Sequence, residues 1–260
     1  MHDKNAVKLI PIDFPTVRVR QRLAPAVINA LQEARITPMR GDVVAVASKV
    51  VSTCEGRVIE LEKVRVTPTA KRLAKRYEID ERLTAIVIGE SDQIFGGVRG
   101  FLLTLTDGIL SANAGVDVKN APPNTAILWP KNPDLSARKL RKDMERRYHT
   151  RLGVEVVDSR VTPLRLGTVG LAIGLSGFSP IRDDRDKLDL YGRSIRVTQT
   201  NVADDLAAMT HVIMGEAKER VGVVLVRNAP VTLGKSANSK QTKMSRDKCL
   251  IGSSLRKASP

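Results

Sequence analysis

Residues 153–178 read GVEVVDSRVTPLRLGTVGLAIGLSGF, and this stretch organises the rest of the chain. The apolar run from Val154 to Val157 predicts a buried strand, which would end at Asp158 and Ser159. A loop containing Arg165 would lead into a second, glycine-rich strand. A carboxylate and a hydroxyl at a rigid strand end indicate a functional site. The alternative is an ordinary polar turn, because Asp and Ser are common turn residues.

The composition is typical of a globular protein with a sizeable core. The chain has 260 residues, of which 42% are hydrophobic and 27% are charged. We find neither an apolar run long enough to span a bilayer nor a signal-type segment, so we expect a cytoplasmic protein without a membrane partner. The two cysteines, Cys54 and Cys249, fit neither a disulfide framework nor a zinc motif and are interpreted as plain thiols.

The strong positive charge leaves two classes of partner open. A net charge of +15 and a pI near 10.2 are compatible with nucleic acid. However, aromatic residues make up only 3% of the chain, which leaves little for base stacking. An enzyme whose ligands carry phosphates and carboxylates explains the charge equally well.

The order of predicted elements favours an α+β fold. Strand-like and helix-like segments alternate irregularly, and residues 101–112 carry a hairpin signal. We therefore predict mixed and antiparallel sheets with flanking helices. Residues 1–230 would form one catalytic unit, which could comprise two closely packed subdomains. Residues 231–260 would form a basic, partly mobile C-terminal tail, in which only the apolar residues 249–251 are expected to dock.

A β-branched run from Asp42 to Ser52 predicts another buried strand. Ser48 and Lys49 lie in the middle of this run. Polar side chains inside a buried strand usually face a ligand or a partner. The alternative is a strand that reaches solvent at this point.

Three carboxylates in loops or at element ends suggest a metal site. Asp117 lies in a glycine-containing loop, Asp158 at the predicted strand end, and Glu216 beside Gly215 after a helix. Magnesium and manganese typically use a few protein carboxylates together with phosphate oxygens and water. Neither a P-loop nor a G-x-G-x-x-G motif is present, which argues against P-loop and Rossmann sites. Spacing alone does not show that the three carboxylates meet, and turn-capping or solvated carboxylates are the alternative.

The combined pattern resembles the coenzyme F420-0:L-glutamate ligase family, the γ-glutamyl ligases of F420 synthesis. The order and spacing of the matching segments agree over most of residues 8–228. The segments that carry the resemblance are GDVVAVASKVVSTCEGR, ANAGVDVKN, LWPKNPDLSARKLR, DSRVTPLRLGTVGLAIGLSGF, DLYGR, ADDLAA, VIMGEAKE and VVLVRN.

The resemblance implies an activity and its cofactors. A member of this family transfers the γ-phosphate of GTP to the terminal carboxylate of F420-0, and the amine of L-glutamate then attacks the acyl phosphate. Further γ-linked glutamates can follow. The resemblance implies two divalent cations per site, magnesium or manganese, and it allows a potassium ion. It also implies an intertwined homodimer and disfavours nucleic acid as a partner.

The resemblance also assigns residues by position. Asp117 and Asp158 would hold one metal ion, and Ser159 and Glu216 the other. Lys49 and Arg165 are candidate clamps for phosphate or the acceptor, while the catalytic residues stay unassigned. The residues expected to contact GTP are Phe14, Pro15, Thr16, Val17, Ser48, Lys49, Thr53, Asn120, Met214, Gly215, Glu216, Ala217, Lys218, Glu219, Arg220 and Val221.

Departures from the family pattern keep other functions open. Members of the family often have Lys where this chain has Thr53, and a more acidic, glycine-rich loop where residues 217–220 read AKER. The segment from Asp158 to Arg165 also differs. A ligase of the same family with a different carboxylate acceptor is therefore one alternative. A basic nucleic-acid-binding protein is the other.

Overall fold

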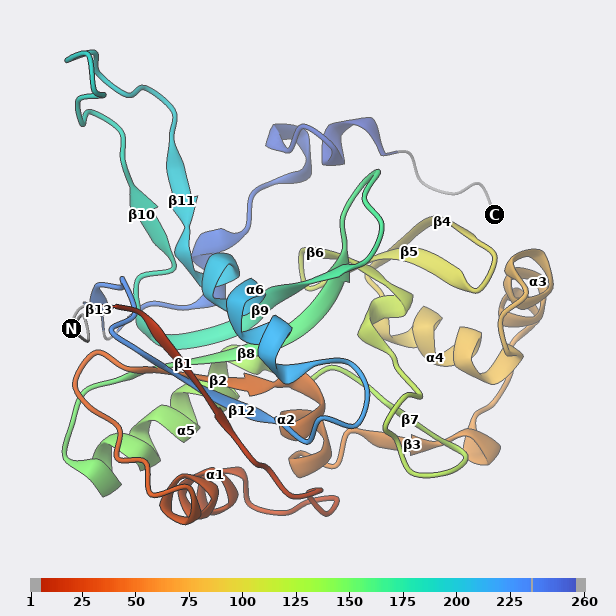
Figure 1. The fold of residues 1–260 in the computed structure, drawn as a ribbon. Helices are drawn as coiled ribbons and strands as arrows, with labels where there is room; N and C mark the ends of the chain where they lie inside the picture. The colour runs from red at the N-terminus through yellow and green to blue at the C-terminus, as the bar shows by residue number, and fades with distance from the viewer. Residues whose placement is uncertain (1–5, 235, 256–260) are drawn as a thin grey trace.

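A six-stranded mixed sheet forms the centre of the protein in a computed structural model that describes residues 6–234 and 236–255 (Figure 1). Neighbouring strands are antiparallel except for the parallel pair β2–β8. The strand order is β1 (Lys8–Ile12), β12 (Val223–Arg227), β2 (Val43–Ala47), β8 (Gly153–Val161), β9 (Thr168–Phe178) and β13 (Leu233–Gly234). The predicted α+β fold with a mixed sheet is confirmed.

Helices cover both faces of this sheet. On one face, α1 (Leu23–Glu33) and α5 (Pro133–Tyr148) pack over a core of β1, β2, β8 and β12 side chains. On the other face lies α6 (Val202–Met214). Two helix starts are capped, because Asn132 accepts from Leu135 N–H in α5 and Asn201 accepts from Asp204 N–H in α6.

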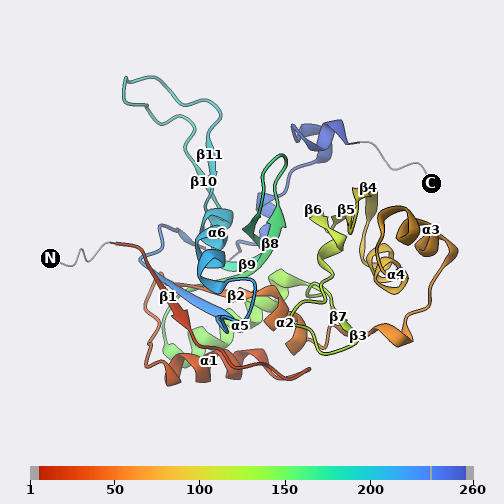
Figure 2. The ribbon, with the colours of Figure 1, turned by 45° about the vertical axis from the view of Figure 1, so that its right-hand side comes forward.

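A smaller α+β lobe lies beside the main sheet (Figure 2). It contains a meander of three strands, covered by two helices. The lobe also contains a separate two-stranded sheet and two 3-10 turns. Its elements are β3 (Val58–Glu60), η1 (Leu61–Lys63), α3 (Pro68–Tyr77), α4 (Glu81–Glu90), β4 (Gln93–Val98), β5 (Phe101–Thr106), β6 (Ile109–Ala112), η2 (Asn113–Gly115) and β7 (Thr125–Ile127).

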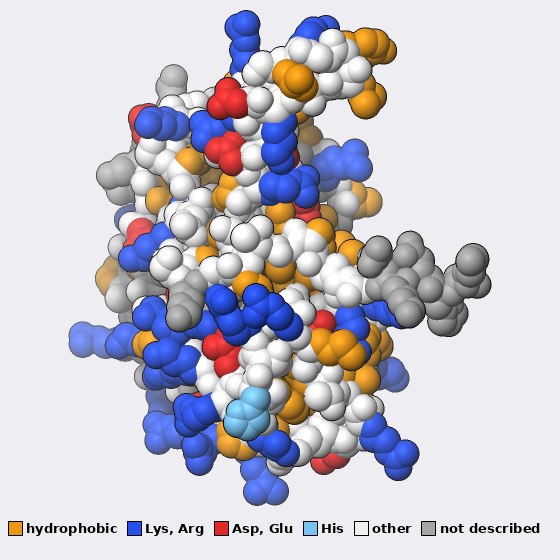
Figure 3. Space-filling model, turned by 90° about the vertical axis from the view of Figure 1, so that its left-hand side faces the viewer, with side chains coloured by type: hydrophobic (Ala, Val, Ile, Leu, Met, Phe, Trp, Pro, Cys, Tyr) orange, Lys and Arg blue, Asp and Glu red, His pale blue; other side chains and the backbone are white. Residues whose placement is uncertain are grey.

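A two-stranded arm, β10 (Ile181–Asp183) and β11 (Gln199–Asn201), projects from the body (Figures 1 and 3). Asp189 of the D-L-Y-G-R motif accepts hydrogen bonds from Tyr191 N–H and Arg193 N–H, so the motif forms a tight turn in this arm. The turn presents Leu190 and Tyr191 outward, with exposed fractions of 100% and 84%. The arm therefore ends in an exposed apolar tip, where the Arg193 guanidinium lies over the Tyr191 ring.

The C-terminal segment folds back over the body through the 3-10 turns η3 (Ser239–Thr242), η4 (Arg246–Lys248) and η5 (Gly252–Ser254). Ser239 Oγ donates to Asp134 Oδ2, and Lys243 pairs with Asp107 at 2.8 Å. Of the residues expected to dock, 249–251, Leu250 is 90% exposed and Ile251 45%, so the expectation was wrong for these two, whereas Cys249 is partly buried. Residues 235 and 256–260 of the predicted tail lie outside the described residues, and the mobility of the tail stays a prediction.

Two predicted element boundaries need correction. The run from Asp42 to Ser52 is not one strand, because β2 ends at Ala47 and α2 (Ser48–Cys54) follows. Strand β8 continues through Asp158 to Val161, because its pairing with β9 resumes after a β-bulge. Helix α6 ends at Met214, because Gly215 has a φ of 69°, so Glu216 follows a helix as expected. No helix among the described residues is long and apolar enough to cross a membrane.

Candidate functional site

The parallel pairing of β2 and β8 brings two separate motifs together. Ala47 lies beside Val157 in the register of the two strands, so Ser48 and Asp158 follow at the same sheet edge. The carboxyl ends of parallel strands are a common location for ligands in α/β proteins. Ser48 is buried at the start of α2 and hydrogen-bonds the Asp158 side chain.

Asp117 reaches this edge from the loop after η2. Backbone hydrogen bonds in both directions tie Asp117 to Ile127 of β7. Its Oδ1 accepts from Lys119 N–H at 2.8 Å, and its Oδ2 lies 2.8 Å from Lys49 Nζ. The carboxylate is therefore fixed by its own loop on one side and by α2 on the other.

Glu216 enters from the end of α6. Its Oε1 lies 2.9 Å from His211 Nε2 and accepts a longer hydrogen bond from Thr168 Oγ1, at 3.5 Å. Its Oε2 lies 3.2 Å from Lys119 Nζ. Burial alone would raise the pKa of Glu216, but hydrogen bonds from His211, Ser159 and Lys119 lower this pKa to about 2. Glu216 is therefore ionised at neutral pH.

Asp158 is the most enclosed of the three carboxylates. Its Oδ2 accepts from Trp129 Nε1, and its Oδ1 accepts from Ser159 N–H at 2.9 Å. Burial raises the pKa of Asp158, although these two hydrogen bonds and the charge of Lys49 act in the opposite direction. A nearby cation would therefore stabilise its ionised form.

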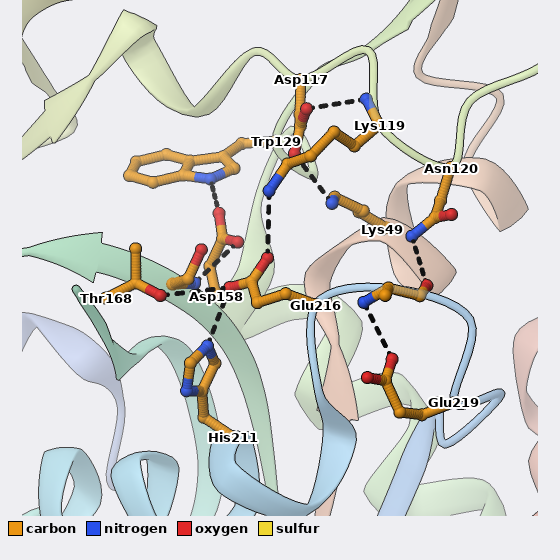
Figure 4. A network of polar contacts seen from close by, with 12 residues as sticks. Lys49, Asp117, Lys119, Asn120, Trp129, Asp158, Thr168, His211, Glu216 and Glu219 are labelled. Carbon is orange, nitrogen blue, oxygen red and sulfur yellow. Dashed lines mark hydrogen bonds and ion pairs between the residues drawn. The ribbon is translucent and has the colours of Figure 1, made fainter.

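The three carboxylates belong to one polar network (Figure 4). Lys49 holds Asp117, and the Lys119 ammonium group lies among the carboxylates of Asp117, Asp158 and Glu216. Within residues 6–234 and 236–255, no three His, Cys, Asp or Glu side chains meet closely enough to hold a metal ion. The donor set still suits a hard cation, because it consists of carboxylate and hydroxyl oxygens. Cation binding would require the lysines to move.

A cavity of about 560 Å³ lies next to this network. Asn120 Nδ2 donates to Ala217 O at its edge, which joins the Asp117 loop to the loop after α6. All the residues expected to contact GTP line this cavity except Ser48, which lies behind Asp158. A larger cavity, of about 780 Å³, lies between α1, α2 and α5 and is lined by none of the predicted site residues.

The structure does not bring Arg165 into the network. Arg165 lies in the exposed loop between β8 and β9, beside Leu164 and Leu166, whose side chains are fully exposed. Conversely, the sequence interpretation missed Lys119, Trp129 and His211 as site residues. Lys119 and Trp129 lie inside segments that carry the family resemblance, whereas an isolated histidine near a helix end gives little signal.

Comparison with known sequences assigns the family. Residues 11–228 match the sequence model of the F420-0:Gamma-glutamyl ligase family. The chain belongs to this family. The coenzyme F420:L-glutamate ligase of Methanothermobacter thermautotrophicus is 36% identical over 226 residues, which cover 86% of this chain and 90% of the relative.

Two further relatives carry the same name. The coenzyme F420:L-glutamate ligase of Methanocaldococcus jannaschii is 36% identical over 89% of this chain and 92% of the relative. That of Methanopyrus kandleri is 39% identical over 72% of this chain and 75% of the relative. In this member of the ligase family, the matched range includes the carboxylate network and the adjacent cavity.

Proposed function

We propose that this protein is a GTP- and divalent-metal-dependent ligase that joins L-glutamate to the terminal carboxylate of coenzyme F420-0. The observation that carries the proposal is the cavity beside the carboxylate network, which Glu216 lines together with Lys49, the ion-pair partner of Asp117. It collects chain segments that are far apart in the sequence, and the relatives are named for glutamate ligation to coenzyme F420.

The chemistry begins with activation of the acceptor. A carboxylate oxygen of F420-0 attacks the γ-phosphorus of GTP, the bond to the β-phosphate oxygen breaks, and GDP leaves. The glutamate amine then attacks the acyl carbon, the carbon–oxygen bond to phosphate breaks, and an amide and inorganic phosphate form with loss of the amine proton. The same sequence would add further γ-linked glutamates.

This reaction depends on positioning and on neutralising the charge of the phosphates. Asp117 and Asp158 would hold one magnesium or manganese ion, and Ser159 and Glu216 the other. These ions would neutralise the charge of the phosphates. Potassium is a further proposed ion. The chain's own contribution is positional. Lys49 lines the cavity and can reach the phosphates once it leaves Asp117, and the loop after α6 closes one wall.

We also propose a homodimer in which the β10–β11 arm embraces the second copy. The apolar tip supports this arrangement, because an arm with Leu190 and Tyr191 almost fully exposed gains stability when another surface covers it.

The test is GDP and phosphate release by the purified protein with GTP, manganese, F420-0 and L-glutamate. We expect release only when both F420-0 and glutamate are present, and its loss in Asp117→Asn. The matched control is Asp107→Asn, which removes an exposed, ion-paired aspartate in the smaller lobe. No turnover with any F420 precursor would refute the proposed substrate.

Two outcomes would support the alternatives. GDP formation with a different carboxylate compound would identify a ligase with another acceptor. Salt-sensitive binding to DNA or RNA without metal-dependent GTP binding would favour the nucleic-acid alternative.

A further inference from the structure

Every carboxylate oxygen of the network already faces a donor. Asp158 uses both oxygens, for Trp129 Nε1 and Ser159 N–H. Asp117 uses one oxygen for Lys119 N–H and one for Lys49 Nζ. Both oxygens of Glu216 are likewise engaged. A divalent cation needs direct contact with such oxygens at about 2.0–2.6 Å. A carboxylate oxygen can accept a hydrogen bond and bind a cation at the same time, but a neighbouring ammonium group repels the cation and has to leave first.

The donors differ in how readily they can leave. Backbone N–H groups and the Trp129 ring are held by the fold around them. Lys119 is different, because its side chain is 61% exposed and its contact in the network is a single ion pair of 3.2 Å to Glu216. Lys49 is more enclosed, with a side chain that is 27% exposed. Of the two ammonium groups, that of Lys119 therefore costs less to displace.

Lys119 also links two of the three carboxylates, those of Asp117 and Glu216. Its backbone N–H caps Asp117, and its ammonium group reaches Glu216, which lies 97 residues further along the chain. The charges of Asp117 and Asp158 also act on this ammonium group. The positive charge of Lys119 thus occupies the region that a metal ion would share with the same three carboxylates (Figure 4).

We propose that Lys119 is a built-in counter-ion that occupies the carboxylate network of the metal-free protein and competes directly with the divalent cation. The proposal rests on the proposed function, because it concerns the same metal site. It has a consequence for the order of binding. A metal ion alone must displace Lys119 without compensation, whereas the phosphates of a metal–nucleotide complex offer the displaced ammonium group a new partner. The cation therefore binds more tightly together with the nucleotide than alone.

The experiment measures manganese binding by isothermal titration calorimetry in the absence of nucleotide. We expect Lys119→Met to bind manganese about fivefold more tightly than the wild type, the upper end of what an ion pair at this level of exposure contributes. Lys119→Gln should behave in the same way, whereas Lys119→Arg retains the competing charge and should match the wild type. The matched control Lys63→Met removes an exposed lysine from a surface ion pair and should leave the affinity unchanged.

A second titration uses the manganese–GTP complex. Here Lys119→Met should bind more weakly than the wild type, because the ammonium group no longer contacts phosphate. The opposite signs of the two effects are the signature of the counter-ion, and a general loss of structure would weaken both.

The outcomes separate the two proposals. If the wild type binds manganese and neither Lys119→Met nor Lys119→Gln binds it more tightly, the counter-ion is overturned and the proposed function stands. If no variant binds manganese, with or without GTP, both proposals fail.

Discussion

Replacing Glu155 with Leu should stabilise the protein at neutral pH. Glu155 lies on β8 with no exposed surface, and neither of its carboxyl oxygens has a hydrogen-bond partner among the described residues. Its neighbours on the adjoining strands, Ala45 and Leu175, belong to the apolar core under α6. A buried polar group without a partner costs about 1–3 kcal/mol. Leucine removes this cost and adds apolar burial at similar volume.

The effect should depend on pH with a defined sign. Burial, followed by the charge of Asp204, raises the pKa of Glu155 well above its ordinary value. The folded protein therefore keeps a proton that the unfolded chain releases above about pH 4.3. Glu155 contributes most to the free energy of unfolding below about pH 4.3, where it is protonated in both states. This contribution is lost as the pH rises toward the pKa of Glu155 in the folded protein, by up to about 1.4 kcal/mol per pH unit. The stability gained in Glu155→Leu should grow over the same window.

The assay is urea unfolding followed by circular dichroism at pH 5, 6, 7 and 8, for the wild type, Glu155→Leu and Glu155→Gln. The glutamine variant keeps the shape and polarity but cannot ionise, so it should flatten the pH dependence with a smaller gain in stability. Titrating groups that do not interact with Glu155 are common to all three proteins and cancel in the differences, whereas Asp204 interacts with Glu155 and is part of the measured effect. A free energy difference between wild type and variants that stays constant from pH 5 to 8 would refute the reasoning.

Three further predictions concern the site and the arm. Gly215→Ala should lower the melting temperature, because a residue with a Cβ at φ 69° costs about 1–2 kcal/mol, and calorimetric scanning measures this. The pKa of Glu216 in the folded protein is about 2, below that of an unfolded glutamate. Its ionised carboxylate therefore stabilises the fold above the unfolded pKa, and this contribution is lost as the pH falls toward 2. The difference in free energy of unfolding between wild type and Glu216→Gln should be constant above pH 5 and vanish near pH 2. Leu190→Asp should shift the protein from dimer to monomer in sedimentation, without changing its circular dichroism spectrum, and an unchanged sedimentation coefficient would contradict the arm's proposed role.

Local sequence patterns predicted the elements well where turn and strand signals agreed. The hairpin of β5 and β6, predicted over residues 101–112, is an example. The prediction of one strand from Asp42 to Ser52 was wrong after Ala47. The valines at positions 50 and 51 suggested a continuing strand, but tertiary contacts place them in the helix α2. Intrinsic preferences for strand or helix are small enough for packing to override them.

The meeting of the carboxylates could not be derived from the residues alone. Asp117, Asp158 and Glu216 come together because β2 pairs in parallel with β8 and because the Asp117 loop bonds to the loop after α6. Both contacts join segments about 100 residues apart. Only the resemblance to a known family linked these positions in advance. It placed Lys49 at the site, but it gave no indication that Lys49 would pair with Asp117 or that Lys119 would occupy the network.

The lysines also explain how this chain accommodates Thr53, where members of the family often have Lys. Residues 49 and 53 are separated by one turn of α2, and both side chains line the same cavity. Lys49, one turn before position 53, therefore supplies a positive charge to the same cavity, and it pairs with Asp117 at 2.8 Å. A lysine bound to a carboxylate of the proposed metal site becomes available to phosphate only when a cation takes its place on Asp117. In the proposed ligase, nucleotide recognition and cation binding would consequently be coupled through Lys49 on one side of the network, as we propose for Lys119 and Glu216 on the other.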